Sequence, residues 1–271
     1  LDLNNYNLHG YIPYSINNLT IIEYIDLSNN NITSSIPYTF GTMKELTYLD
    51  LSVNNIIGSI PSELGNLTQI EYLSLANNYI TNTIPLEITN LTKLIYLYLE
   101  LNQLIGRIPY TINTLIELKY LDLSSNMFTN TIPNNLHYLN MLEYLDFSFN
   151  FISGSISNHI YTMPKLSTLI LNHNFLNGNL NIQNFSQIEY IELNNNMFST
   201  SIPIEIKYLT KLQYFDISSN YMTSSIPYTI GNLNNLLYFS ISNNQITGSI
   251  PSSIGFLYQL YFLYLDNNLM N

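Results

Sequence analysis

One short pattern repeats along the whole chain, and this repetition constrains the fold more than any other feature. The unit LxLxxN places an Asn every 24 residues, apart from one interval of 22 residues between Asn174 and Asn196. The Asn residues in this register are Asn30, Asn54, Asn78, Asn102, Asn126, Asn150, Asn174, Asn196, Asn220, Asn244 and Asn268. Uninterrupted units of this length predict a solenoid in which each turn stacks only on its neighbours. We therefore expect one solenoid domain of about twelve turns over residues 1–271.

Within each unit the residues predict a strand, an inward turn and a short helical return. In "YLDLS" apolar and polar residues alternate, as in a strand with one buried face, so stacked turns should form a continuous parallel sheet. The Asn should be buried and should form a ladder by bonding the backbone of its own turn and the next one. In "IIGSIP" Gly permits unusual backbone angles and Pro ends the extended segment. Residues 62–72 then carry apolar residues three apart, which predicts a helical return.

These motifs, LxxLxLxxN followed by LxGxIPxxLxxL, resemble the plant-type leucine-rich repeat of receptor-kinase ectodomains and polygalacturonase inhibitors. The resemblance covers essentially the whole chain. It implies an α/β solenoid with a parallel sheet on its concave side, short helical or 3-10 returns on its convex side, and binding on the concave face. Plant-type members tend to have cysteine-rich caps, whereas this chain contains no Cys. We therefore expect the chain to be an internal or truncated part of a longer one.

Composition excludes several classes of function. Seven Lys and Arg residues stand against 18 Asp and Glu, a net charge of −11 that argues against nucleic acid and anionic lipid as partners. No apolar run is long enough to span a bilayer, so we expect no membrane insertion of this segment. The absence of Cys excludes disulfides and thiolate metal sites. The chain has no phosphate-binding loop, nucleophile elbow or HExxH motif, which predicts a non-enzyme without cofactor or metal.

Two columns of side chains should follow one another along the outer face of the sheet. The first column is almost entirely aromatic: Tyr24, Tyr48, Tyr72, Tyr96, Tyr120, Tyr144, Thr168, Tyr190, Tyr214, Tyr238 and Phe262. Its rings could pack on one another to stabilise the sheet, or they could bind a protein or a glycan. The second column is acidic: Asp26, Asp50, Asp122, Asp146, Glu192 and Asp216. Asp is ordinary here in the plant-type repeat; the row should raise some of its own pKa values and favour a polar or basic protein partner.

The exceptions to the repeat are the candidate contacts, because they have escaped the pattern that the other turns follow. One strand carries Tyr96, Tyr98 and Glu100, with Leu101 beside them. Another carries Thr168, Ile170 and Asn172, with His173 beside them, and the last strand adds Tyr264. We expect one continuous binding surface that consists of Tyr96, Tyr98, Glu100, Tyr120, Asp122, Tyr144, Asp146, Phe149, Ile170 and His173.

Other surfaces support alternative functions. Pairs of Ser or Thr two residues apart recur after the Asn, as at Thr81 and Thr83, and a grid of such hydroxyls is also typical of ice-binding solenoids. Uncapped solenoid ends favour a structural component of a larger surface or shell assembly, joined through the ends or the convex side. Ser157 stands where Pro is expected and the next unit is two residues short, which predicts a tighter return. His159 and His173 lie nearby, but two His without a pattern of carboxylates do not predict a metal site.

Acceptor triplets for N-glycosylation occur on the outer segments. The accessible ones are Asn18, Asn66, Asn90 and Asn184, whereas Asn31 lies next to the ladder. They are consistent with an extracellular or surface-exposed protein.

Overall fold

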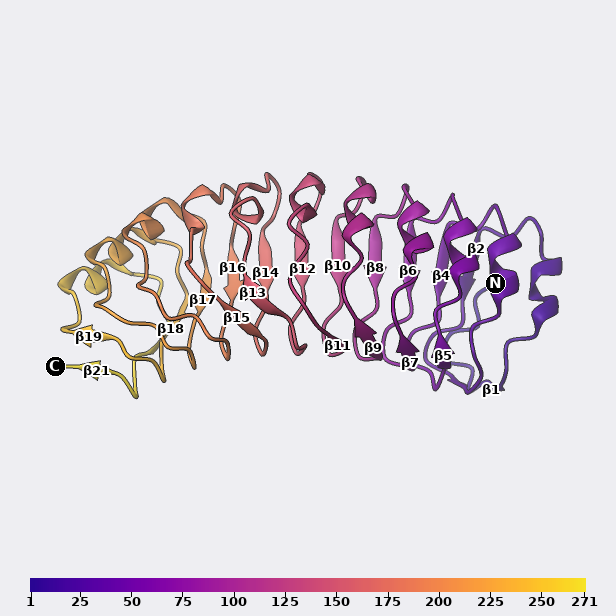
Figure 1. The fold of residues 1–271 in the computed structure, drawn as a ribbon, viewed down its shortest axis with the longest axis horizontal. Coiled ribbons are helices and arrows are strands. Elements are labelled where there is room, and N and C mark those ends of the chain that lie inside the picture. Colours follow the sequence, from indigo (N-terminus) through magenta and orange to yellow (C-terminus); the bar gives the residue numbers. More distant parts are fainter. The chain divides into compact units, whose positions relative to one another are not determined.

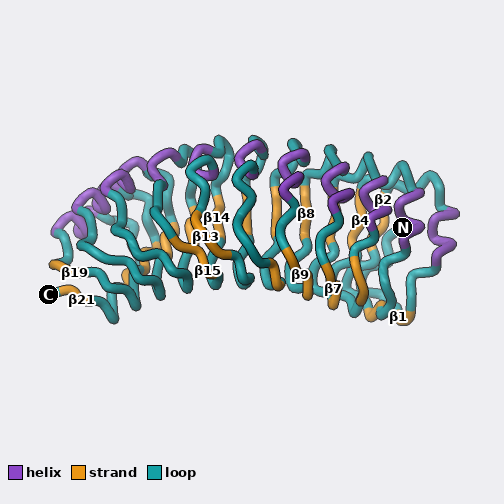
Figure 2. The backbone as a smooth tube through the Cα atoms, in the orientation of Figure 1, coloured by secondary structure: helices purple, strands orange, loops and turns teal.

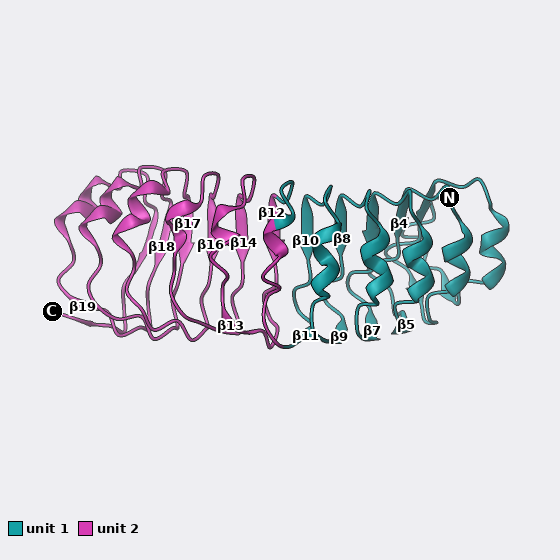
Figure 3. Cartoon of the chain, turned by 45° about the horizontal axis from the view of Figure 1, so that its top comes forward, with its two compact units in different colours: residues 1–129, 138–142 teal, residues 130–137, 143–271 magenta.

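The computed structural model describes all 271 residues, and these residues form two compact units. Unit 1 consists of Leu1–Thr129 with Tyr138–Leu142, and unit 2 of Asn130–His137 with Glu143–Asn271 (Figure 3). Each unit is a stack of similar turns, so the predicted solenoid of parallel strands and short returns is confirmed.

Each turn contributes one three-residue strand to a parallel main sheet. In unit 1 these strands are β2 (Tyr24–Asp26), β4 (Tyr48–Asp50), β6 (Tyr72–Ser74), β8 (Tyr96–Tyr98) and β10 (Tyr120–Asp122) (Figure 1). In unit 2 they are β12 (Tyr144–Asp146), β14 (Thr168–Ile170), β16 (Tyr190–Glu192), β17 (Tyr214–Asp216), β18 (Tyr238–Ser240) and β20 (Phe262–Tyr264). Equivalent residues of neighbouring turns pair directly, as Tyr48 does with Tyr72, so each repeat position becomes a column on the sheet.

A second set of short parallel strands forms the flank of each unit, after the Asn. The flank strands of unit 1 are β1 (His9–Gly10), β3 (Asn31–Ile32), β5 (Ile57–Ser59), β7 (Tyr79–Asn82), β9 (Gln103–Gly106) and β11 (Met127–Phe128). Those of unit 2 are β13 (Ser153–Ser155), β15 (Phe175–Asn177), β19 (Thr247–Gly248) and β21 (Leu269–Met270).

The returns are 3-10 helices, which form a row in each unit (Figure 2). They are η1 (Tyr14–Asn18), η2 (Tyr38–Thr42), η3 (Ser62–Asn66), η4 (Leu86–Asn90), η5 (Tyr110–Thr114), η6 (Leu136–Tyr138), η7 (Ile160–Thr162), η8 (Ile182–Asn184), η9 (Ile204–Tyr208), η10 (Tyr228–Asn232) and η11 (Ser252–Phe256). In η3 the preceding Pro61 has φ −66°, which fixes the entry, and the helix closes with a bond from Leu67 N–H to the Leu64 carbonyl (3.0 Å).

Each inner turn buries a layer of aliphatic side chains, whereas the first and last turns leave Leu1 and Leu263 exposed. In the turn that begins with β4 the layer consists of Leu49, Leu51, Ile56, Ile60, Leu64, Leu67 and Ile70, none of them more than 4% exposed. The strand, the flank and the return therefore all face the same core, which explains why the aliphatic positions recur unchanged from turn to turn.

The ladder Asn joins neighbouring turns through its side chain. Asn78 donates from Nδ2 to the carbonyls of Leu51 (3.0 Å), Leu75 (3.2 Å) and Ala76 (3.1 Å), and its Oδ1 accepts from Ile56 N–H (2.9 Å). A buried amide is thereby satisfied and in turn satisfies buried backbone groups. The residue before each ladder Asn has a positive φ, 51° at Asn77 for example, which a side chain other than Gly or Asn adopts at a cost.

The unit between Asn174 and Asn196 is two residues shorter than the others. Its return helix η8 has three residues, as have η6 and η7 in full-length turns, so helix length alone does not distinguish it. The ladder bond from Leu176 N–H to Asn196 Oδ1 spans 20 residues, instead of the 22 residues spanned from Ile56 to Asn78.

Candidate functional site on the main sheet

The tyrosine column of the main sheet forms a parallel ring stack in each unit. Tyr24, Tyr48 and Tyr72 stack in unit 1 with centroids 4.3 and 4.2 Å apart. Tyr190, Tyr214 and Tyr238 stack in unit 2 with both separations at 4.2 Å. Burial in the stack raises the pKa of Tyr72 to about 12, with the charge of Asp50 as a second cause. These rings therefore pack on one another in the arrangement expected of a sheet-stabilising column.

The aspartates of the second column are buried by their neighbours and do not form an exposed acidic row on the outer face. Asp26 is 6% exposed. Its Oδ1 accepts from the N–H (2.9 Å) and hydroxyl (2.7 Å) of Ser28, and its Oδ2 accepts from the Tyr24 hydroxyl (3.3 Å). Asp50 and Asp146 are covered in the same way: their Oδ2 atoms accept from the hydroxyls of Tyr48 (3.4 Å) and Tyr144 (3.3 Å), and the N–H two residues later binds each carboxylate.

The same arrangement holds at the aspartates that we predicted as contacts. Asp122 and Asp146 are both buried, and each accepts a bond from the N–H of the serine two residues on, at 2.9 and 2.8 Å. Their carboxylates are therefore bonded within the fold and are not accessible to a partner.

Burial also controls the acidity of this column in unit 2. Desolvation raises the pKa of Asp146, and bonds from Ser148 and Tyr144 oppose the rise. Desolvation likewise raises the pKa of Glu192, to which the charges of Asp216 and Asp146 add. The predicted rise in pKa is present, but its main cause is burial and repulsion along the row is secondary.

In unit 1 the ring stack breaks at β8, where the sequence departs from its template. Tyr98 replaces the usual aspartate, and its ring lies 5.5 Å from Tyr72 at an angle of 45°. Tyr96 and Tyr98 are parallel to within 2°, with centroids 6.4 Å apart, and Tyr120 lies 5.0 Å from Tyr98. Tyr96 is 37% exposed, while Tyr98 and Glu100 are half-buried. The structure thus brings together the predicted residues Tyr96, Tyr98, Glu100 and Tyr120 on one face.

In unit 2 the predicted residues Tyr144, Asp146, Phe149, Ile170 and His173 lie on and beside β12 and β14. Ile170 pairs with Asp146 in the sheet and is half-buried. Phe149 and His173 stack with centroids 4.1 Å apart, and both have a positive φ, 52° and 53°. His173 Nε2 also lies 3.2 Å from Asn195 Nδ2. Phe149 remains 50% exposed, so this pair is an accessible aromatic patch at the end of the strands.

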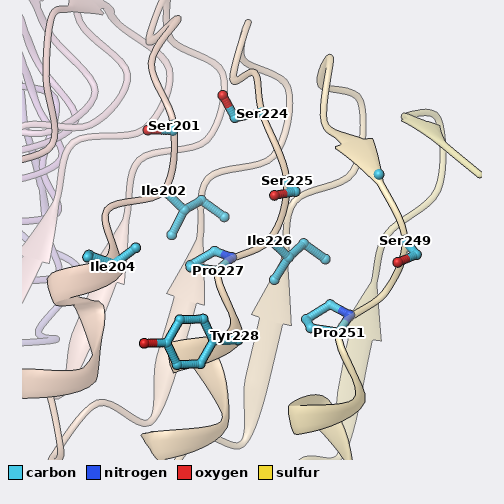
Figure 4. Close-up of a pocket in the computed structure, with 11 residues that line it drawn as sticks. Ser201, Ile202, Ile204, Ser224, Ser225, Ile226, Pro227, Tyr228, Ser249 and Pro251 are labelled. Carbon is cyan, nitrogen blue, oxygen red and sulfur yellow. The ribbon is translucent and has the colours of Figure 1, made fainter.

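The flank carries the Ser and Thr pairs, but the two hydroxyls of a pair have different surroundings. In four pairs the first hydroxyl belongs to a Thr that is bonded within the fold, as Thr81 Oγ1 donates to the Gly58 carbonyl (3.1 Å). The second one lines an open groove above the returns. In unit 2 Ser201, Ser225 and Ser249 line it together with Pro227 and Tyr228 (Figure 4). A corresponding groove in unit 1 is lined by Ser35, Ser59 and Thr83.

Other sequence expectations concern metals, membranes and sugars. No group of three or more His, Asp or Glu side chains is arranged to hold a metal ion. None of the helices is both long enough and apolar enough to cross a membrane. The acceptor residues Asn18, Asn66, Asn90 and Asn184 are exposed, and each is the last residue of its 3-10 helix.

Sequence comparison finds the same repeat that the structure shows. A leucine-rich-repeat family model matches residues 1–56, and a second one matches residues 69–91, 117–139, 141–163, 211–233 and 235–257. No curated protein matches the sequence.

Solved structures resemble the chain over nearly its whole length. The Arabidopsis receptor kinase HAESA, in complex with the peptide hormone IDA and the co-receptor SERK1, is 30% identical with a TM-score of 0.94; the match covers 100% of this chain and 46% of that one. A TDR receptor is 30% identical with a TM-score of 0.93, over 97% and 46% of the two chains. A plant ice-binding protein is 26% identical with a TM-score of 0.79, over 92% and 80%. The chain spans less than half the length of the two receptor chains.

Proposed function

The chain belongs to the leucine-rich-repeat family, in its plant-type form, and on this premise we propose that it is a non-catalytic scaffold that recognises a peptide or protein segment across the face of its main sheet. One observation carries the proposal: large side chains lie accessible on or beside this face, namely the repeat tyrosine Tyr96 and two residues that depart from the repeat, Leu101 and Phe149. Tyr96, Phe149 and Leu101 are 37%, 50% and 51% exposed. Accessible aromatic side chains of this kind are typical of the central contacts of interfaces.

The backbone adds support, because some of these side chains occupy positions that disfavour them. Leu101, Phe149 and His173 precede a ladder Asn and have positive φ; five other turns use Asn at this position, and the remaining three use Val53, Ser125 and Ser219. An L-residue other than Gly or Asn costs roughly 1 kcal/mol in this conformation. A stability cost combined with solvent exposure supports a role in binding.

Similar structures and charge support the class of partner. The similar receptor kinase HAESA is in complex with a peptide hormone, which supports a peptide as the partner of this face. The net charge of −11 favours a basic or polar partner through electrostatic complementarity. We propose accordingly that the protein acts outside the cell or on its surface.

A selection experiment tests the proposal. Random displayed peptides are selected on the wild-type chain and then measured against the double variant Tyr98→Ala with Ile170→Ala. The control is Tyr38→Ala, which removes a tyrosine 57% exposed on the outer return η2. We expect basic peptides whose binding is lost in the double variant and kept in the control. Peptides that bind both variants equally would refute recognition by this face.

Ice binding is the second candidate, favoured by the flank grooves and by the similarity to a plant ice-binding protein. The exposed second hydroxyls recur in several turns, whereas four of the first ones are bonded to a backbone carbonyl within the fold. Thermal hysteresis and inhibition of ice recrystallisation are the direct measurements. Absence of both would remove this candidate.

A further inference from the structure

The break in the ring stack occurs twice, once in each unit and at equivalent residues. The second sheet column contains Asp50, Ser74 and Tyr98 on β4, β6 and β8. The same column contains Asp216, Ser240 and Tyr264 on β17, β18 and β20. Each residue of the second set follows its counterpart by 166 residues, which is seven turns with the one short turn included.

The two breaks have the same geometry. Tyr98 lies 5.5 Å from Tyr72 at 45°, and Tyr264 lies 5.5 Å from Tyr238 at 45°. Each of these tyrosines is parallel to the ring two residues before it, with centroids 6.4 Å apart in both units. The stacked tyrosine donates to the aspartate of the preceding strand at 3.4 Å, Tyr72 to Asp50 and Tyr238 to Asp216. The arrangement is therefore a repeated local structure within each unit.

A carboxylate accompanies each break. Glu100 follows Tyr98 by two residues, and Asp266 follows Tyr264 by two residues. Because side chains alternate along a strand, each acid lies on the same face as the tyrosine before it. Glu100 is half-buried and Asp266 is exposed. The charge of Glu100 reaches Tyr98, since it is among the causes that raise the pKa of that tyrosine, after burial and the neighbouring tyrosines.

We infer that each unit carries an aromatic–acidic cage for a positively charged side chain, guanidinium or ammonium, of a bound peptide. The cage of unit 1 consists of Tyr72, Tyr96, Tyr98 and Glu100, and that of unit 2 of Tyr238, Phe262, Tyr264 and Asp266. The inference rests on the proposed recognition of a peptide by this face and names the group that is recognised. It gives two cation sites per chain, one in each unit.

Electrostatics favours a cation over other occupants. The faces of aromatic rings are negative and attract a cation, and a nearby carboxylate strengthens that attraction. The cation–ring contacts made by the chain itself, Arg107 with Tyr110 and Lys207 with Tyr208, lie on or beside the outer returns. With a net charge of −11, the chain repels an anionic group at both cages.

The test compares a cation with its neutral isostere. The full chain, with isotope-labelled tyrosine and phenylalanine rings, is titrated by NMR with N-acetyl-argininamide and with N-acetyl-citrullinamide. We expect ring signals of both cages to shift with argininamide, and binding of citrullinamide to be at least about fivefold weaker. Equal binding of the two probes would overturn the inference, as would an absence of shifts with argininamide.

Substitutions taken from the repeat itself assign the two sites. Tyr98→Ser and Tyr264→Ser introduce the residue that Ser74 and Ser240 provide in the same column, so the fold already accepts it there. Each single variant should retain binding only in the other unit, and the double variant should retain none. Binding that persists in the double variant, while the remaining ring signals show an intact fold, would also overturn the inference.

The two proposals can fail separately. Selected peptides that require Tyr98 and Ile170 but bind equally well after every Arg is replaced by citrulline would leave recognition intact and remove the cages. Charge-dependent binding of argininamide at both cages, without any selected peptide that requires this face, would leave the cages and refute recognition.

Discussion

Replacement of one ladder Asn should destabilise the fold strongly, because the structure assigns it bonds that nothing else can make. Asn78→Ala removes the acceptor of Ile56 N–H and the donor to three carbonyls. Ile56 is completely buried, so water cannot replace the lost partner. A buried backbone group left without a partner costs about 1–3 kcal/mol, and we expect a total loss of about 3 kcal/mol in the free energy of unfolding.

Asn268→Ala is the matched control for burial. Asn268 makes the same bonds, accepting from Ile246 N–H (3.0 Å) and donating to the carbonyls of Ile241, Leu265 and Asp266. Ile246 is as fully buried as Ile56, so its N–H still loses its partner, but Asn268 is only half-buried and Leu265 and Asp266 lie near solvent, so water can reach their carbonyls. The loss should therefore be smaller than for Asn78→Ala, about 1–2 kcal/mol. Urea unfolding, monitored by circular dichroism, measures both losses. The comparison holds if the dependence of the free energy of unfolding on urea concentration is the same in wild type and variants. Equal losses for the two variants would refute the argument from burial.

Three further predictions follow from the titrating groups and the glycines. Because burial raises the pKa of Glu192, the folded state holds the proton of this carboxyl more tightly than the unfolded state does. The wild type should therefore lose stability relative to Glu192→Gln as the pH rises above 4.5, which the midpoints of urea unfolding measure. A stability difference that does not change with pH would contradict this. The stabilisation linked to Tyr72 should be complete below pH 10 and lost as the pH rises towards 12. Tyrosinate absorbance of Tyr72 should therefore appear near pH 12 while the fold persists, and its appearance near pH 10 in the folded protein would contradict this. Gly65→Ala places a Cβ 2.2 Å from the Glu87 carbonyl oxygen and should cost about 1–3 kcal/mol. In Gly255→Ala, at the same position of its turn, the new Cβ meets no atom within 4 Å, so the free energy of unfolding should be unchanged. Thermal melts of both variants measure this difference.

The sequence was sufficient to predict the turn, because the turn depends on short-range patterns that are repeated many times. Alternation at Tyr48, Leu49 and Asp50 identified a strand with one buried face, and the spacing of the Asn residues identified the stacking period. Pro61 and Leu64 indicated a short helical return, and the two missing residues before Asn196 indicated which turn is shorter than the others.

The state of the acidic column could not be predicted, because it depends on one side chain covering another. Alternation places Asp26 on the outer face of the sheet, but it does not show that the Tyr24 ring covers it or that Ser28 binds it. The left-handed conformation of Phe149 and His173 was missed as well. The signal was present, since Asn occupies this position in several other turns and tolerates that conformation.

The two cages also bear on whether departures from the repeat are drift. Duplication of a seven-turn block would copy Tyr98 into position 264 without any selection for binding. The copies have since diverged, however: Ile95 corresponds to Tyr261 and Leu101 to Asn267. At the cage positions the changes preserve chemistry, because Tyr96 corresponds to Phe262 and keeps a ring, while Glu100 corresponds to Asp266 and keeps a carboxylate. Drift would not distinguish these positions from their neighbours, so the retained rings and charges favour a shared ligand group over shared ancestry alone.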